Sequence, residues 1–353
     1  MTANNILVLL PDLQQAGYVP GSAEKHIRAA VPNVDNVTVR LVSREQHIDD
    51  EDWKDVTCLL TLAILPPSSA VAPKMKYIQT FSAGIDHLMD MPYIHELQEK
   101  KLDVMIANAS GVHGPQIAEW VIMSILSLSH KLPAILRWQD KHFWGQQRLI
   151  ETTQRLGDQW GRRIGIFGYG AVGRQVARVC SAMGMDVVAY SHRNPPRKTY
   201  KEIAVPGSGD SDGTIPSKWF AGRDTFRDFL SCGLDVILIS APLTPDTRGI
   251  FNAEAFELMK GALLVNIARG GLVNTSDLIT ALCTGTLNGA ALDVTDPEPL
   301  PADHPLWEAP NVIISPHISG HSAAYVERVL RILCYNLNQF NEPHPDFCNR
   351  IVL

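Results

Sequence analysis

A glycine-rich turn between a short apolar run and a helical pattern constrains the fold of this 353-residue chain most. The turn follows residues 164–167 and consists of Gly168, Tyr169, Gly170, Ala171, Val172 and Gly173. In a strand–turn–helix unit the first glycine makes the tight turn and the second lets the backbone approach a diphosphate. The third lets the helix pack closely on the strand. A second strand is expected over residues 186–190, after Gly184, and this is the context that a dinucleotide-binding βαβ unit requires.

The residues at the end of that second strand bear on which dinucleotide is bound. An acidic residue there selects NAD, because it accepts hydrogen bonds from the ribose hydroxyls. Here the chain has Ser191, His192 and Arg193 instead, followed by the basic residues Arg197 and Lys198. Hydrogen-bond donors and positive charge suit a 2′-phosphate, which a carboxylate would repel. The sequence therefore predicts NADP(H) as the preferred cofactor, with NAD(H) possible. The alternative is a basic loop that is only solvated.

The overall composition narrows the class of protein and its partners. A net charge of −6 and a pI near 6.0 argue against nucleic acid or an anionic membrane as the main partner. No apolar run is long enough to span a bilayer. The six cysteines are scattered without C-x-x-C or metal-like spacing, so we expect reduced thiols, no metal site and a cytoplasmic location.

Apolar runs alternate with helical patterns along the whole chain, which indicates parallel sheets covered by helices. We expect strands at residues 6–10, 37–42, 58–64, 77–81, 104–107, 234–240, 263–267, 289–294 and 312–315. Amphipathic helices are expected over residues 23–30, 117–132, 253–260, 276–283 and 323–340. The fold class is therefore α/β, with two Rossmann-like or flavodoxin-like parallel-sheet domains and the active site in the cleft between them. Residues 1–109 plus 321–353 form the substrate-binding domain, and residues 110–320 form the dinucleotide-binding domain.

A small-residue loop, residues 82–87, follows the fourth expected strand. Ligands of open α/β sheets bind at the carboxyl ends of the strands. The backbone N–H groups of Ala83 and Gly84 could hold a substrate carboxylate there. The alternative is a simple turn before a helix.

Two further stretches carry expectations of their own. Residues 137–159 show no clear helix or strand period but are rich in aromatic residues, with Trp138, Phe143 and Trp144. Such an arm favours burial against a second subunit, so we expect a homodimer. Residues 201–220 are heavy in Gly, Ser, Asp and Pro, and we expect a mobile surface insertion that is dispensable for the chemistry.

Three titratable residues stand at carboxyl ends of strands in the cofactor domain: Arg269, Glu298 and His317. The planar guanidinium of Arg269 can hold a substrate carboxylate and carbonyl. The imidazole of His317 can donate a proton near neutral pH, and Glu298 can orient it and keep it protonated. Each residue also has an ordinary alternative, such as a surface ion pair or a solvated turn, but their shared placement favours a catalytic role.

Taken together, these segments resemble the D-isomer-specific 2-hydroxyacid dehydrogenase family, in its glyoxylate/hydroxypyruvate reductase-like branch. The resemblance covers nearly the whole length and rests on six segments, residues 82–87, 168–173, 240–247, 265–271, 291–301 and 315–320. It implies that Arg269 binds substrate, that Glu298 pairs with His317, and that His317 is the acid/base. It also implies homodimers joined through the cofactor domains. The remaining candidate cofactor contacts are Ala241, Pro242, Leu243, Thr247, Ile267, Ala268 and Asp293.

The resemblance implies reversible reduction of a small 2-keto acid to a D-2-hydroxy acid, but the sequence does not select the acid. Residues 111–120 resemble fungal-type relatives, and Ser191–His192–Arg193 resembles the NADPH-using reductases. One alternative is a co-repressor-like protein of the same fold that senses NAD(H), which would favour the acidic residue that this chain lacks. Formate dehydrogenase is another, but it carries glutamine where this chain has Glu298.

Overall fold

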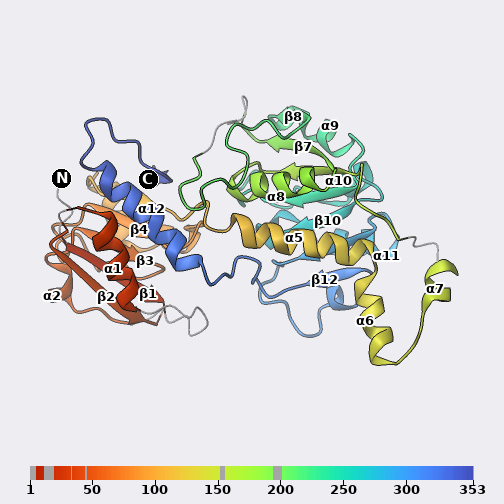
Figure 1. Ribbon diagram of the computed structural model, residues 1–353, viewed down its shortest axis with the longest axis horizontal. Coiled ribbons are helices and arrows are strands. Elements are labelled where there is room, and N and C mark those ends of the chain that lie inside the picture. Colours follow the sequence, from red (N-terminus) through yellow and green to blue (C-terminus); the bar gives the residue numbers. More distant parts are fainter. Residues whose placement is uncertain are drawn as a thin grey trace. The chain divides into compact units, whose positions relative to one another are not determined.

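The computed structural model describes residues 5–11, 20–32, 34–43, 46–151, 156–193 and 201–352 (Figure 1). The chain forms two compact units. Unit 1 contains Met1–Val112, Lys201–Gly207 and Ser322–Leu353, and unit 2 contains His113–Tyr200 and Ser208–His321. The expected domain boundaries lie within a few residues of these, but Lys201–Gly207 was not expected in unit 1. The basic residues Arg197 and Lys198 lie outside the described residues.

Unit 1 is a helix-covered sheet. Among its described residues, the six-stranded sheet has the order β13-β5-β4-β3-β1-β2, and only the short edge strand β13 is antiparallel. Its strands are β1 (Asn5–Pro11), β2 (Asn36–Val42), β3 (Cys58–Thr61), β4 (Tyr77–Thr80), β5 (Met105–Ala107) and β13 (Arg350–Ile351). Its helices are α1 (Pro20–Ala30), α2 (Asp50–Trp53), α3 (Asp86–Met89), α4 (Pro92–Glu99) and α12 (Tyr325–Gln339).

The C-terminal segment completes unit 1, as the amphipathic pattern of the last helix predicts. In Figure 1 the blue helix α12 lies beside the red helix α1, and Asn338 Nδ2 donates to the carbonyl oxygen of Ala30. Val329 and Leu333 of α12 are fully buried in the same apolar cluster as strands β1 and β3. The core of unit 1 is therefore built from N-terminal and C-terminal segments together.

Unit 2 holds a parallel sheet of seven strands among the described residues, in the order β12-β11-β10-β9-β6-β7-β8. Its strands are β6 (Arg163–Phe167), β7 (Asp186–Ser191), β8 (Lys218–Ala221), β9 (Val236–Ile239), β10 (Leu263–Asn266), β11 (Gly289–Leu292) and β12 (Val312–Ile314). Its α-helices are α5 (Gly114–Ser129), α6 (Leu132–Asp140), α7 (Gln146–Glu151), α8 (Ala171–Ala182), α9 (Phe226–Leu230), α10 (Ala253–Leu258) and α11 (Thr275–Cys283). Three short 3₁₀ turns within the described residues are η1 (Arg223–Thr225), η2 (Gly270–Leu272) and η3 (Pro305–Glu308).

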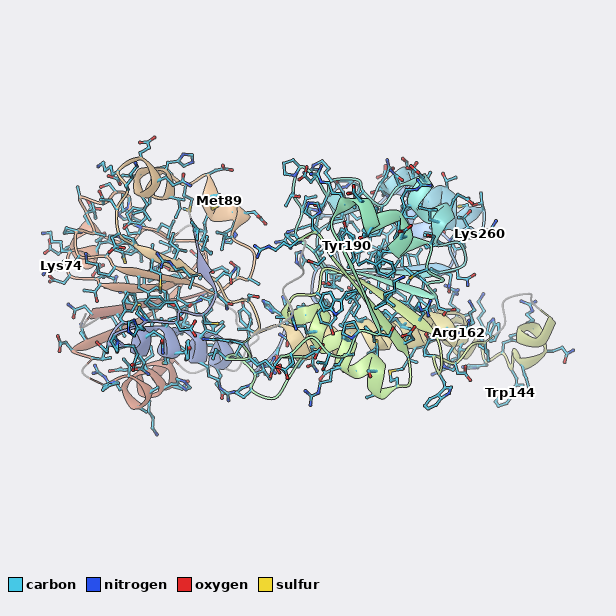
Figure 2. The ribbon with its side chains drawn as sticks, turned by 90° about the horizontal axis from the view of Figure 1, so that it is seen from above. Lys74, Met89, Trp144, Arg162, Tyr190 and Lys260 are labelled. Atoms are coloured by element: carbon cyan, nitrogen blue, oxygen red, sulfur yellow. The ribbon has the colours of Figure 1, made fainter. Side chains whose placement is uncertain are left out.

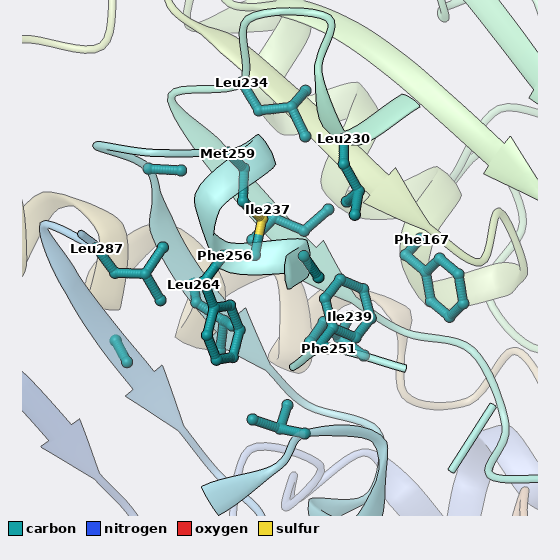
Figure 3. Close-up of a cluster of buried hydrophobic side chains, with 14 of the residues drawn as sticks. Phe167, Leu230, Leu234, Ile237, Ile239, Phe251, Phe256, Met259, Leu264 and Leu287 are labelled. Atoms are coloured by element: carbon teal, nitrogen blue, oxygen red, sulfur yellow. The ribbon is translucent and has the colours of Figure 1, made fainter. Parts of the chain in front are cut away.

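Helices cover both faces of this second sheet, which is why its strands are continuous apolar runs. Helices α5 and α8 pack on one face through residues such as Val121 and Val176. The opposite face carries an aromatic-rich cluster in which Phe167, Phe251 and Phe256 pack beside aliphatic residues of β9 and β10 (Figure 3). The strand order reverses between β6 and β9, so the carboxyl ends of these two strands form the topological switch point where a ligand is expected.

The structure corrects two of the sequence-based expectations. Residues 201–220 are not a loose surface insertion, because Ala204 is buried in the core of unit 1 and β8 (Lys218–Ala221) forms the edge of the second sheet. Residues 137–159 are not without helical structure, because the last turn of α6 and the whole of α7 lie there. No residue of α6 is buried, and its apolar residues Leu132, Ile135 and Leu136, at helical spacing, are exposed.

All six cysteines lie within the described residues and are free thiols. Burial raises the pKa of Cys180 and of Cys334 to about 12, so these thiols stay protonated and unreactive. Among the described helices, none is both long enough and apolar enough to cross a membrane. In the same part of the chain, no three His, Cys, Asp or Glu side chains are grouped so as to hold a metal ion.

Candidate active site

The glycine turn after β6 has the shape that a bound dinucleotide needs. Gly168 has a φ of +100°, and a Cβ there would lie 2.7 Å from the backbone nitrogen of Ala241. A Cβ on Gly173 would lie 2.5 Å from the carbonyl oxygen of Gly168. Gly170 differs from both, because it is exposed and a Cβ there would meet nothing within 4 Å. The turn is therefore tight on its protein side and open where a diphosphate would approach.

Helix α8 begins directly behind that open position. Gly170 is its N-cap, and no side chain among the described residues caps this end. The first N–H groups of a helix have no partner within the helix, and together with the helix dipole they form an anion site. Ala171 and Val172 are the first residues of α8. The open glycine turn and the N-terminus of α8 thus fit the diphosphate of a dinucleotide.

The residues that follow β7 form a short exposed loop, which we call the Ser191 loop (residues 191–193). Ser191 is half-buried at the end of the strand, and His192 and Arg193 are exposed. The Ser191 hydroxyl oxygen accepts a hydrogen bond from the backbone nitrogen of Arg193 at 3.2 Å. Among the described residues of this loop there is no carboxylate; its side chains are the Ser191 hydroxyl, the His192 ring and the Arg193 guanidinium.

The loop after β9 is held in shape by one buried threonine. The hydroxyl of Thr247 accepts from the backbone nitrogen of Thr244 at 2.8 Å and donates to the carbonyl oxygen of Pro242 at 3.0 Å. Ala241 of this loop lies against Gly168, and Leu243 lies beside Gly271 in the loop after β10. The candidate cofactor residues of three strand ends are therefore neighbours in space.

The turn that carries Arg269 is built around Asn266, the last residue of β10. The Asn266 side chain is buried; its oxygen accepts from the backbone nitrogen of Ala268, and its amide donates to the carbonyl oxygen of Arg269, both at 3.0 Å. Gly270 follows so close to the carbonyl of Thr295 that no Cβ would fit. Ile267 and Ala268 are half-buried on this turn. The backbone of Arg269 is thus fixed on both sides.

Glu298 and His317 meet, as their placement at strand ends and the family resemblance led us to expect. The distance between Glu298 Oε1 and His317 Nδ1 is 2.7 Å, and both side chains are partly exposed. This contact leaves the other ring nitrogen, Nε2, available to a ligand. His317 has a φ of +56°, a left-handed conformation that non-glycine residues adopt rarely and that is often found at functional sites.

The buried carboxylate of Asp293, at the end of β11, holds this strained segment. We call residues 315–319 the His317 loop. Asp293 accepts hydrogen bonds from the Ser315 hydroxyl at 2.6 Å, from the backbone nitrogens of Ile318 at 2.9 Å and Ser319 at 3.1 Å, and from the Ser319 hydroxyl. The backbone nitrogen of His317 donates to the Asp293 carbonyl oxygen at 2.9 Å. Four bonds to one carboxylate offset the cost of the unusual backbone.

The candidate substrate loop lies in unit 1, directly after β4. Ala83 and Gly84 are half-buried, and the carbonyl oxygen of Ala83 accepts from Asn108 Nδ2 at 2.8 Å. The Thr80 hydroxyl donates to the carbonyl oxygen of Ser82 at 2.8 Å. The loop is a structured turn, with its carbonyls engaged by the protein.

The family of the chain follows from its match to known proteins. Residues 122–210 and 222–319 match the family model for the NAD binding domain of D-isomer specific 2-hydroxyacid dehydrogenases, which is more than half of the sequence. The chain belongs to the D-isomer specific 2-hydroxyacid dehydrogenase family. It is accordingly an oxidoreductase that uses a nicotinamide cofactor.

Relatives in this dehydrogenase family align over most of the chain. The glyoxylate reductase of Thermofilum pendens is 31% identical, over 84% of this chain and 80% of the relative. The hydroxypyruvate reductase of Blautia hydrogenotrophica is 34% identical, over 77% and 78%. A crystal structure of a D-isomer specific 2-hydroxyacid dehydrogenase family protein from Aeromonas salmonicida covers 99% of both chains with a TM-score of 0.74 and 26% identity.

Some residues of this 2-hydroxyacid dehydrogenase site carried no prediction of their own. The Asn266 side chain bonds to the backbone of Arg269. The hydroxyls of Ser315 and Ser319 bond to Asp293 and so hold the His317 loop. Their signal was weak but present, because Asn266 is a polar residue at the end of an otherwise apolar strand run. Tyr169 and Asp210, 41 positions apart, are a further pair that no local pattern indicated.

Proposed function

We propose that the protein catalyses the reversible NAD(P)H-dependent reduction of a small 2-keto acid to a D-2-hydroxy acid, in the manner of glyoxylate and hydroxypyruvate reductases. The observation that carries the proposal is the 2.7 Å contact between Glu298 and His317 on the same sheet edge as Arg269 and the glycine turn. The glyoxylate and hydroxypyruvate reductases among the relatives support this substrate class.

In this proposal His317 is the acid/base. Its Nδ1 faces Glu298, so Nε2 would give a proton to the carbonyl oxygen of the keto acid during reduction and take it back during oxidation. The carboxylate of Glu298 stabilises the imidazolium and fixes the ring orientation. Arg269 would hold the substrate carboxylate through its guanidinium, and the backbone N–H groups of Ala83 and Gly84 would bind the same class of anion.

A bound nicotinamide dinucleotide supplies the hydride in such reactions. We assign its diphosphate to the glycine turn and its adenosine ribose to the Ser191 loop. The Ser191 hydroxyl, the His192 ring and the Arg193 guanidinium suit a 2′-phosphate, so NADP(H) is preferred and NAD(H) is the weaker cofactor. The full set of assigned residues is Gly168, Gly170, Ala171, Val172, Gly173, Ser191, His192, Arg193, Ala241, Pro242, Leu243, Thr247, Ile267, Ala268 and Asp293.

We further propose that two chains associate through the aromatic arm around α6 and α7. Trp144 is 88% exposed and Phe143 is 45% exposed, and Leu136 of α6 is half exposed. Figure 2 shows Trp144 at one end of unit 2, away from the sheet of that unit. Apolar side chains gathered this way mark a protein interface. A light-scattering mass of one chain, 38.9 kDa, at micromolar concentration would contradict the homodimer.

The experiment that tests the function is a substrate panel with the purified protein. Glyoxylate, hydroxypyruvate, pyruvate and an aryl 2-keto acid are each offered with NADPH and with NADH, and loss of absorbance at the nicotinamide band is followed. We expect turnover of at least one small acid, a D-configured product where the product is chiral, and higher kcat/KM with NADPH. Dinucleotide binding without turnover of any acid would instead favour the cofactor-sensing protein of the same fold.

A variant of Arg269 separates its charge from its geometry. Arg269→Lys keeps the positive charge but loses the planar fork, so KM for the keto acid should rise and kcat should fall, together lowering kcat/KM by about tenfold or more. Arg248→Lys, on an exposed side chain of the loop after β9, is the matched control. If Arg269→Lys behaves as the wild type, the carboxylate is held elsewhere.

A further inference from the structure

The segment that the sequence predicted to be a dispensable insertion contains a buried carboxylate. We call residues 208–215 the Asp210 turn. Asp210 is 7% exposed, and its two carboxylate oxygens accept from the backbone nitrogens of Thr214 at 3.1 Å and Ile215 at 3.2 Å. One of these oxygens also accepts the hydroxyl of Tyr169 at 2.7 Å. A loop that only covers the surface has no need for a buried charge with this many partners.

Tyr169 lies inside the glycine turn, between Gly168 and Gly170. Its ring is buried and packs edge-on against Trp219 of β8, with ring centroids 4.8 Å apart. Burial, together with the hydrogen bond to Asp210, raises the pKa of Tyr169 far above its usual range, so the hydroxyl remains a hydrogen-bond donor at every working pH. The Tyr169 side chain therefore anchors the centre of the glycine turn to the buried side of the protein.

The first two turns of α8 are bonded to the same segment. The Arg174 guanidinium is buried; it donates to the carbonyl oxygen of Asp210 and lies 5.0 Å from the Tyr169 ring centroid. Gln175 Oε1 accepts from the backbone nitrogen of Gly209 at 2.6 Å, and Arg178 donates to the Gly209 carbonyl oxygen at 3.3 Å. Contacts from one short segment thus reach both the glycine turn and the helix whose N-terminus follows it.

The contacts of the Asp210 turn limit the conformational freedom of the glycine turn. Three glycines within six residues give the backbone many alternative conformations, and fixing one of them on ligand binding costs conformational entropy. A turn that is already fixed in the free protein avoids that cost and binds more tightly. Gly170 is open to solvent, and the turn is held on its protein side. There the Ser240 hydroxyl donates to the Gly168 carbonyl oxygen at 2.7 Å, and the Tyr169 side chain adds an anchor through its bond to Asp210.

We propose that Asp210 and Tyr169 are positioning residues of the dinucleotide site, and that the Asp210 turn holds the glycine turn in the conformation that receives the diphosphate. The inference rests on the proposed use of a dinucleotide and adds to it a role for the segment 201–220. Because the diphosphate is common to both cofactors, the Asp210 turn affects NADPH and NADH equally. The Ser191 loop, in contrast, discriminates between them.

The experiment measures dissociation constants for NADPH, NADH, ADP and adenosine by isothermal titration of the full chain, with competition against NADPH for the weak ligands. Tyr169→Phe removes only the hydroxyl, and Asp210→Ala removes the acceptor. Each variant should raise Kd for NADPH, NADH and ADP by one common factor. We expect about tenfold for Tyr169→Phe, which loses one charge-assisted hydrogen bond, and at least that for Asp210→Ala, which also removes the acceptors of the Thr214 and Ile215 backbone nitrogens. Binding of adenosine, which lacks the diphosphate, should not change, and kcat at saturating cofactor should stay near the wild-type value.

Two comparisons make the result specific. Asp210→Asn keeps one acceptor oxygen for the Tyr169 hydroxyl, so its loss of affinity should be smaller than that of Asp210→Ala. Tyr190→Phe is the matched control, since it removes a hydroxyl that donates to the Gly222 carbonyl oxygen at 3.3 Å, outside both the glycine turn and the Asp210 turn. If Asp210→Ala does not fold, Tyr169→Phe still decides the question.

The outcomes separate the inference from the function on which it rests. An unchanged Kd in Tyr169→Phe, with or without a lower melting temperature, would overturn the positioning role and leave the function intact. A change confined to NADPH would also overturn it, because the effect would then belong to the 2′-phosphate. A wild-type protein that binds none of the dinucleotides would refute the proposed cofactor, and the inference would fall with it.

Discussion

The His317 loop and the Ser191 loop lie at the same edge of one sheet, but the protein holds them very differently. The His317 loop is bonded to a buried carboxylate by four hydrogen bonds, and its central residue is kept in a left-handed conformation. In the Ser191 loop, the backbone nitrogen of Arg193 donates to the Ser191 hydroxyl within the loop itself. The Ser191 carbonyl oxygen accepts from the backbone nitrogen of Gly222 at 3.0 Å, and both His192 and Arg193 are exposed.

The difference corresponds to the role of each loop in the proposed function, which is proton transfer for the His317 loop and cofactor selection for the Ser191 loop. Proton transfer depends on distance and angle, and a misplacement of about 1 Å can cost a factor of about 10² in rate. Selection of a doubly charged phosphate depends mainly on the sign of nearby charge, which acts over several ångströms. A buried scaffold is therefore needed at His317, while exposed polar side chains suffice at the Ser191 loop.

The largest effect is expected at the rigid loop. His317→Ala should lower kcat by about 10²–10⁴, because proton transfer contributes that much, while Kd for the dinucleotide stays nearly unchanged. Glu298→Gln should lose less, since it keeps a hydrogen-bonding group beside the ring but not the charge. His321→Ala, on an exposed histidine four positions further along, serves as the control. A wild-type kcat in His317→Ala would show that another group carries the proton.

The exposed loop should respond in cofactor choice and not in stability. Two charge-assisted bonds to a 2′-phosphate predict a preference for NADPH over NADH of about a hundredfold. Ser191→Asp should invert it, because a carboxylate repels the phosphate and accepts from the ribose, while it can still accept from the Arg193 backbone nitrogen. Arg193→Ala should only weaken the preference.

Steady-state kcat/KM with each cofactor, in wild type and in both variants, checks this prediction of cofactor choice. The melting temperature should not move in either variant, because the two side chains are exposed or at a strand end. A wild-type enzyme that prefers NADH would mean that the Ser191 loop is only a solvated basic segment.

The regions that the sequence revealed share one physical property. Buried parallel strands are continuous apolar runs, and the rule that ligands bind at their carboxyl ends makes Arg269, Glu298 and His317 candidates from the sequence alone. The α/β architecture with two parallel sheets was confirmed. The glycine turn was recognisable because its steric demands, as at Gly168 and Gly173, are local to a few residues.

The regions that could not be predicted from the sequence depend on contacts with residues far away in the chain. Strand β8 is a four-residue edge strand behind a stretch with the composition of a surface loop, so neither length nor pattern revealed it. Asp210 is buried only because Tyr169 and Arg174 meet it from another part of the chain. In each case the deciding interaction lies outside the window that a sequence pattern covers.

The smallest expected effect tests whether the rigidity of the His317 loop matters in itself. Asp293→Asn replaces one of two acceptor oxygens by an amide, so some of the donors from Ser315, Ile318 and Ser319 lose their partner, at about 1–3 kcal/mol for each buried group. The melting temperature should fall by several degrees and kcat by about tenfold, as His317 samples unproductive positions. Asp296→Asn, on an exposed carboxylate three positions away, should change neither quantity. A lower melting temperature with unchanged kcat would mean that Asp293 stabilises the unit without positioning His317, and the contrast between the two loops would then be one of stability alone.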